Sequence, residues 1–114
     1  MSFDEIKTVI ETACQACETT LDFDHVATAF STPDGPFLDL VCTSILRATG
    51  IDTLRDTGGG TSDGRFLAAA GVPVAELGTT NSTIHQVDEQ VAVSELAALT
   101  AIYADIIKHF EVVD

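Results

Sequence analysis

The stretch from Gly58 to Gln90 constrains the fold most, because it opens with three successive glycines. Glycine suits positions with positive φ and positions where the backbone approaches a ligand closely. Polar side chains are denser here than elsewhere, and one short apolar piece, residues 72–77, interrupts them. No lysine follows the glycines as in a P-loop, and the spacing does not match G-x-G-x-x-G. The residues alone leave a flexible loop and a ligand-binding loop both open.

The segments around this stretch carry regular apolar patterns. Apolar residues that recur every three or four positions predict helices, and short runs rich in β-branched and aromatic residues predict strands. On this basis we expect helices at 2–19, 37–49, 64–70 and 94–113, and strands at 21–30, 51–57 and 72–77. The order predicts an α/β fold in which the helices pack on a short mixed sheet.

Several helix ends can be read from single residues. Ser2 and Glu5 have the spacing of a capping box. Gly50 is placed to end the second helix, and Ser94 is placed to cap the last one. The turn-forming sequence at 31–36, STPDGP, is the clearest boundary in the chain.

Charge and hydropathy exclude several classes of partner. The sequence has 18 acidic and 5 basic residues, a net charge of −13, so neither nucleic acid nor an anionic membrane is an expected partner. No apolar run approaches the roughly 20 residues that span a bilayer. The N-terminus lacks a signal-peptide pattern, and 46% hydrophobic residues suffice for a core. We therefore expect a small soluble cytoplasmic protein.

The three cysteines favour free thiols. Cys14 and Cys17 form a C-x-x-C sequence, which is compatible with a redox pair or with half of a zinc site. No second cysteine pair completes such a zinc site, and both residues fall on the apolar side of a predicted helix. Structural, reduced thiols are the favoured interpretation and again point to the cytoplasm.

Two residues of the central stretch are candidates for binding. His85 lies in the loop after the predicted strand 72–77, near Asp88 and Glu89, where it is either a metal ligand or an ordinary loop histidine. Arg65 lies in the first turn of a predicted helix, where a cation opposes the helix dipole. That position suggests a carboxylate partner, either from the protein or from a substrate.

The motifs GGGTSDGRF at 58–66, ELG at 76–78 and NSTIH at 81–85 resemble, in order and spacing, the C-terminal part of the succinyl-diaminopimelate desuccinylases. These enzymes belong to a zinc-dependent metallopeptidase and deacylase superfamily. The resemblance covers most of this chain but only about the last third of the family's enzyme. It implies hydrolysis of N-succinyl-LL-2,6-diaminopimelate to succinate and LL-diaminopimelate, in lysine biosynthesis.

The resemblance also implies roles for individual residues. His85 matches the histidine that ligates one of two active-site zinc ions. The expected substrate-binding residues are Gly60, Thr61, Asn81 and Arg65. No catalytic residue is expected in this segment, because the family's other metal ligands and its general-base glutamate come from motifs that the chain lacks. The chain alone is therefore expected to be inactive, and the full-length enzyme to be a homodimer.

The same resemblance predicts two partial domains. Residues 1–28 resemble the end of the lid, or dimerisation, domain, and residues 29–114 resemble the C-terminal part of the catalytic domain. Two alternatives stay open. One is a non-catalytic acidic α/β module that binds a partner or a small carboxylate. The other is a related deacylase, such as an acetylornithine deacetylase.

Overall fold

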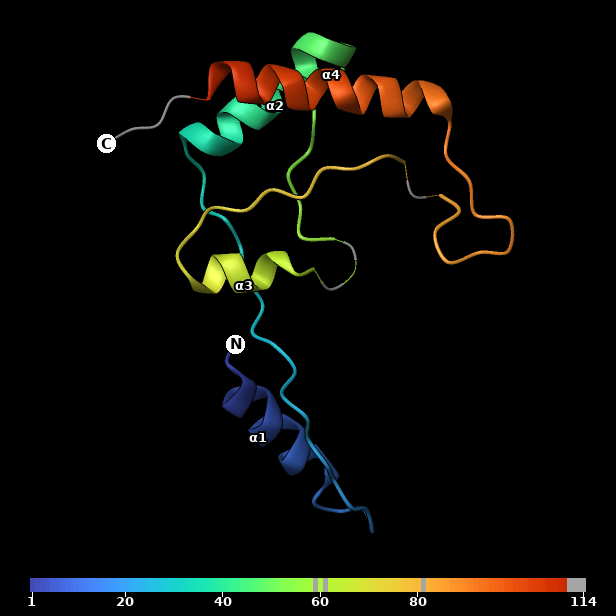
Figure 1. The fold of residues 1–114 in the computed structure, drawn as a ribbon. Coiled ribbons are helices and arrows are strands. Elements are labelled where there is room, and N and C mark those ends of the chain that lie inside the picture. Colours follow the sequence, from blue (N-terminus) through green and yellow to red (C-terminus); the bar gives the residue numbers. More distant parts are fainter. Residues whose placement is uncertain (59, 61, 81, 111–114) are drawn as a thin grey trace. The chain divides into compact units, whose positions relative to one another are not determined.

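The computed structural model describes residues 1–58, 60, 62–80 and 82–110. Over these described residues the chain forms four helices: α1 (Phe3–Cys14), α2 (Pro36–Thr49), α3 (Gly64–Ala69) and α4 (Val93–His109) (Figure 1). The chain divides into two compact units, Met1–Phe30 and Ser31–Asp114, which are described separately below. The proposal that such units correspond to a lid domain and a catalytic domain remains a prediction. Within the described residues, no helix is long and apolar enough to cross a membrane.

The first unit is built on α1, whose start was predicted correctly. The Glu5 amide donates to Ser2 Oγ (3.2 Å), and the Ser2 amide donates to Glu5 Oε2 (2.6 Å), which completes the capping box. The helix ends at Cys14, five residues before the predicted end at Thr19. There the Cys17 amide donates to the Cys14 carbonyl (2.9 Å), an i→i+3 bond that tightens and ends the last turn.

An aromatic cluster holds the rest of the first unit to α1. The Phe3 ring stacks on the His25 ring, with centroids 4.4 Å apart, and meets the Phe23 ring edge-on at 6.4 Å. The Lys7 ammonium lies 5.6 Å from the Phe23 centroid. Residues 21–30, predicted as a strand, thus contact the helix through side chains and form no strand.

The second unit is organised around the packed pair α2 and α4 (Figure 1). Val41, Ile45 and Ile102 form its buried core, which we call the α2–α4 core. Ser44 is fully buried between them, and the Arg47 guanidinium lies 2.7 Å from Asp105 Oδ2 of α4. These contacts join two helices that are far apart in the sequence.

The ends of α2 follow the sequence closely. Pro36 occupies the first turn, where its missing amide is not needed. Gly50 ends the helix with φ at 74°, a left-handed conformation that glycine adopts without strain, and its amide donates to the Leu46 carbonyl (2.8 Å). The prediction of this helix and of its glycine cap is confirmed.

The predicted α/β fold, with helices packed on a short mixed sheet, is wrong for this structure. The described residues form helices, turns and irregular segments and contain no strand. The predicted strands at 21–30, 51–57 and 72–77 have no ladder, because a strand exists only when a neighbouring segment pairs with its backbone. At Val74 the hydroxyl of Thr32 takes that place: it donates to the Val74 carbonyl (2.6 Å) and accepts from the Val74 amide (3.0 Å).

The predicted cap of the last helix is also wrong. The N-cap of α4 is Ala92, and no side chain caps it. Glu95 of the first turn instead accepts from the Thr80 amide (2.9 Å) and so ties the preceding loop to the helix. The described part of α4 ends at His109, whereas the predicted end at residue 113 falls outside the described residues.

Candidate functional site

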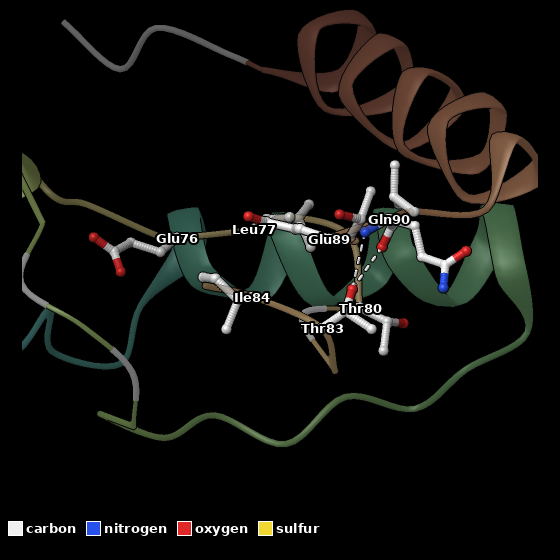
Figure 2. Close-up of a pocket in the computed structure, with 10 residues that line it drawn as sticks. Glu76, Leu77, Thr80, Thr83, Ile84, Glu89 and Gln90 are labelled. Atoms are coloured by element: carbon white, nitrogen blue, oxygen red, sulfur yellow. Dashed lines mark hydrogen bonds between the residues drawn. The ribbon is translucent and has the colours of Figure 1, made fainter. Parts of the chain in front are cut away.

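The loop after residues 72–77 borders an open pocket. The pocket has a volume of about 660 Å³. Its wall consists of the end of the extended segment and both sides of the loop: Glu76, Leu77, Gly78, Thr79, Thr80, Thr83, Ile84, Glu89, Gln90 and Val91 (Figure 2). Carboxylate, hydroxyl and amide groups share this wall with the apolar side chains of Leu77, Ile84 and Val91, so the pocket is of mixed character. It lies inside the stretch that the sequence singled out.

Three side chains hold the loop in this shape. Thr83 Oγ1 donates to the Gln90 carbonyl (2.9 Å) and accepts from the Gln90 amide (3.1 Å), which closes the loop across seven residues (Figure 2). The Tyr103 hydroxyl donates to the Leu77 carbonyl (2.8 Å) at the start of the loop. Glu95 holds the Thr80 amide, as described above. Helix α4 therefore fixes the position of the pocket wall.

Sequence reasoning missed the two residues of α4 that do this work. By its spacing, Tyr103 belongs to the apolar stripe of the last predicted helix, where its ring fits the pattern. A phenol on such a stripe was the available signal, since the hydroxyl of a tyrosine in contact with the protein usually finds a hydrogen-bond acceptor. Its acceptor lies 26 residues away and cannot be read from local spacing. Glu95 was not singled out.

His85 lies at the tip of the loop in an unusual backbone conformation. Its φ is 60° and that of Asp88 is 63°, both in the left-handed region that residues other than glycine seldom adopt. The side chain is exposed and is not part of the pocket wall. The loop therefore presents the imidazole to its surroundings. Its role as a metal ligand stays a prediction.

The described residues do not fit a complete metal site. They contain no group of three or more histidine, cysteine, aspartate or glutamate side chains close enough to hold an ion. A tetrahedral zinc site requires four ligands, three of them from protein even when the site is catalytic. His85 can supply one nitrogen to a site, and the remaining ligands have to come from elsewhere.

Arg65 occupies the first turn of α3. Ser62 Oγ accepts from the Gly64 amide (2.9 Å) and shapes the turn into the helix, whereas the N-cap residue, Asp63, makes no side-chain cap bond. The Arg65 guanidinium lies 4.8 Å from the Phe66 ring centroid. Its Nε atom is buried and has no hydrogen-bond partner within the part of the chain that the structure describes.

The other two arginines are paired with carboxylates. Arg47 binds Asp105 (2.7 Å), and Arg55 binds both Asp34 (2.6 Å) and Asp39 (2.7 Å). A guanidinium donor buried without an acceptor costs free energy. Among the described residues, Arg65 is thus the arginine without a carboxylate partner, and its guanidinium can donate to an anionic ligand.

The remaining predicted substrate-binding residues are only partly placed. Gly60 is exposed, and a Cβ atom built on it would meet nothing within 4 Å. Thr61 and Asn81 lie outside the described residues. The roles predicted for Gly60, Thr61, Asn81, Arg65 and His85 all stay predictions.

Comparison with known proteins identifies the family. Residues 5–109 match peptidase family M20/M25/M40. The chain is 47% identical over 90 residues to a succinyl-diaminopimelate desuccinylase of Halorhodospira halophila, a match that covers 79% of this chain and 24% of the relative. It is 55% identical over 74 residues to one of Pseudomonas fluorescens, covering 65% and 19%, and 51% identical over 80 residues to one of Shewanella piezotolerans, covering 70% and 21%.

These matches confirm the resemblance seen in the three motifs. They also show that this chain spans about a fifth to a quarter of the length of the relatives it matches. The family match, by contrast, takes in almost the whole chain. The chain therefore belongs to peptidase family M20/M25/M40, whose members are generally metal-dependent.

Proposed function

We propose that this chain acts as the C-terminal part of a zinc-dependent amidohydrolase that converts N-succinyl-LL-2,6-diaminopimelate to succinate and LL-diaminopimelate, in lysine and diaminopimelate biosynthesis. Support comes from the relatives, which are named as succinyl-diaminopimelate desuccinylases and share about half of the aligned residues. The three free cysteines are consistent with a cytoplasmic enzyme. We further propose that the whole enzyme is a homodimer.

The substrate assignment rests on one observation, the Nε–H donor of Arg65 that the described residues leave unpaired. Its Nε donor is buried and lacks an acceptor among the described residues, in a chain with 18 acidic side chains. A succinylated diamino acid carries several carboxylates, and a guanidinium binds a carboxylate through two parallel hydrogen bonds. Arg65 therefore serves as a carboxylate-binding residue of the substrate site.

The position of the Arg65 donor matters for specificity. Leaving a buried donor unpaired costs about 1–3 kcal/mol. A substrate that supplies a carboxylate at this point removes that cost, whereas an analogue without the carboxylate does not. Arg65 thus favours a substrate that brings a carboxylate to this point, whether from the succinyl group or from the amino-acid part.

His85 has a separate part in the proposal. Its exposed ring on a left-handed residue is available to a zinc ion whose other ligands come from the rest of the enzyme. The described residues do not complete such a site, so no step of the hydrolysis is assigned to this chain. The isolated chain is expected to have no hydrolase activity.

A chimera tests the proposed function. The matched region of the Halorhodospira halophila desuccinylase is replaced by this chain, and hydrolysis of N-succinyl-LL-diaminopimelate and of N-acetylornithine is followed with zinc present. We expect hydrolysis of the succinyl substrate, lost at least about 100-fold in His85→Ala and unchanged in the matched control His109→Ala. Preference for N-acetylornithine would replace the proposal with a related deacylase. A folded but inactive chimera would favour a non-catalytic binding module.

A further inference from the structure

The first unit contains a pair of cysteines, Cys14 and Cys17, that the proposed hydrolysis does not use. The sequence pattern places both thiols on the apolar side of a helix that runs to Thr19, which favours buried, structural thiols. In the structure α1 ends at Cys14, and Cys17 lies beyond the helix with its side chain exposed. Cys14 is partly buried, and both cysteines are free. The reason for giving them a purely structural role therefore does not hold.

The turn after α1 brings the two cysteines close together. The Cys17 amide donates to the Cys14 carbonyl (2.9 Å), so residues 14–17 close a turn. The first and fourth Cα atoms of such a turn lie less than about 7 Å apart. A disulfide bond spans Cα atoms that are about 4.4–6.8 Å apart. The backbone therefore needs little movement for a bond between the two sulfur atoms.

The two side chains also share one open pocket, which has a volume of about 350 Å³. Its wall is formed by Glu11, Cys14, Gln15, Cys17, Thr19 and Leu21. The described part of the chain holds no group of three or more histidine, cysteine, aspartate or glutamate side chains that could bind a metal ion. A metal site at these thiols is therefore not supported, and thiol–disulfide exchange is the reaction that two adjacent thiols can perform.

Negative charge around the pair determines which disulfide can approach it. Glu18 follows Cys17 directly, and Glu11 lines the pocket, where Lys7 lies 3.7 Å from its carboxylate. The last turn of α1 contains no basic residue, so the negative end of the helix dipole is not offset there. Such surroundings repel an anionic disulfide and attract a cationic one.

We propose that Cys14 and Cys17 form a reversible dithiol site that reduces a small cationic disulfide and is itself oxidised to an intramolecular disulfide. The thiolate of exposed Cys17 attacks the small disulfide, forms a mixed disulfide with one half and releases the other half as a thiol. The Cys14 thiolate then attacks Cys17 Sγ, which forms the protein disulfide and releases the second thiol. Two electrons pass from the cysteines to the small disulfide, and the two cysteine protons end on the released thiols.

The resting state of the site is the dithiol, in which the structure shows it. An excess of small thiol reverses the reaction, so the disulfide is a transient state in a reducing compartment. The reaction uses neither zinc nor a succinylated substrate. The inference therefore goes beyond the proposed hydrolysis and does not depend on it.

Mass spectrometry of the whole chain tests the site. The reduced chain is treated with cystamine, a small cationic disulfide, and the remaining thiols are then blocked with iodoacetamide. We expect a product that has lost two hydrogen atoms and is alkylated at Cys42 alone. Cys14→Ser and Cys17→Ser should instead keep half of the cystamine on the remaining cysteine, whereas the control Cys42→Ser should form the internal disulfide. Alkylation of all three cysteines, mixed disulfides alone, or a bond to Cys42 in the original chain would overturn the proposal.

Rates show whether the folded turn and its charge carry the reaction. Closure of the internal disulfide should be at least about tenfold slower in denaturant, because the turn that holds the two thiols together is then lost. Equal closure rates in the folded and denatured chain would overturn the proposal.

The class of disulfide is tested with glutathione disulfide, which is anionic. Each rate is divided by the rate of the same disulfide with dithiothreitol, which removes differences in intrinsic reactivity. At low ionic strength the ratio should be at least about tenfold lower than for cystamine, and added salt should narrow the difference. Equal ratios for the two disulfides would contradict the assignment of a cationic substrate. A chain that reacts as expected here but gives an inactive chimera would contradict the proposed hydrolysis alone.

Discussion

The α2–α4 pair and residues 72–90 are held together by different kinds of contact. The helix pair buries Val41, Ile45 and Ile102 through apolar packing, to which Ala75 and Leu77 of the extended segment also contribute. Residues 72–90 depend on single hydroxyls and carboxylates, those of Thr32, Thr83, Tyr103 and Glu95, for their shape. A helix satisfies its backbone internally, whereas an extended segment requires a neighbour. The difference explains why one region is complete in this chain and the other is open.

The largest expected effect is a loss of stability when a buried side chain of the α2–α4 core is shortened. Ile45→Ala and Ile102→Ala should each lower the free energy of unfolding by about 2–4 kcal/mol, since each opens a cavity in a core of three buried residues. Chemical denaturation followed by helical circular dichroism measures the loss. Ile107→Ala, on the same helix but 75% exposed, is the control and should change little. Equal losses at Ile107 and Ile102 would mean that the two helices do not pack as described.

The extended segment should respond to a smaller change. Thr32→Val removes both hydrogen bonds to Val74, each worth about 0.5–1.5 kcal/mol. We expect faster exchange of the Val74 amide with α2 unaffected. Thr8→Val, which removes a hydroxyl bond to Asp4 on the exposed side of α1, is the control. If Val74 exchange were the same in both variants, Thr32 would not hold the segment.

The helix caps allow a local comparison. Ser2→Ala should reduce α1 stability by about 1 kcal/mol, because it removes half of the capping box. Ser94→Ala should have no such effect, because the N-cap of α4 is Ala92. Amide exchange at the start of each helix distinguishes the two. A loss at α4 as large as that at α1 would restore the predicted role of Ser94.

The smallest expected effect is a pH dependence in the stability of the α2–α4 pair. Desolvation raises the pKa of Asp105, but hydrogen bonds from Ser44 and Arg47 and the nearby Arg47 charge outweigh it, and the pKa lies below its ordinary value. The His109 ring, 3.3 Å from Asp105 Oδ1, faces the same carboxylate. The contribution to stability is therefore present at neutral pH and is lost as pH falls below about 4 through the folded-state pKa.

Asp105→Asn tests this pH dependence. The variant should be less stable at pH 7, and its stability should decline less than that of the original chain between about pH 4 and pH 2. Thermal unfolding across that range measures the difference, with Asp52→Asn as the control. Parallel acid profiles for the original chain and Asp105→Asn would show that this carboxylate is not the group involved.

How far the sequence predicts the structure depends on how far apart in the sequence the contacting residues are. The helix at 37–49, its Gly50 cap and the Ser2 capping box were predicted correctly, because each depends on residues within one or two turns. The strands were predicted wrongly. Their formation depends on a partner segment, and apolar runs such as 72–77 carry the pattern of a strand whether or not that partner is present.

The candidate site shows the same division. The sequence located the loop and singled out Arg65 and His85, since both stand out locally by residue type and position. It did not find Tyr103 as a support of the pocket wall, because the Leu77 carbonyl that it binds is 26 residues away. Nor could it show that Arg65 lacks a partner while Arg47 is paired with an aspartate 58 residues away.

Zinc binding by the isolated chain is the measurement that tests most directly whether this chain holds only part of a site. Calorimetry compares the original chain with His85→Ala at neutral pH. We predict weak binding, of the order of 0.1 mM or weaker, that the substitution leaves unchanged, because one imidazole and a diffuse acidic surface do not make a tetrahedral site. Tight binding that is lost in His85→Ala would contradict this, because the chain would then complete a metal site from its own residues.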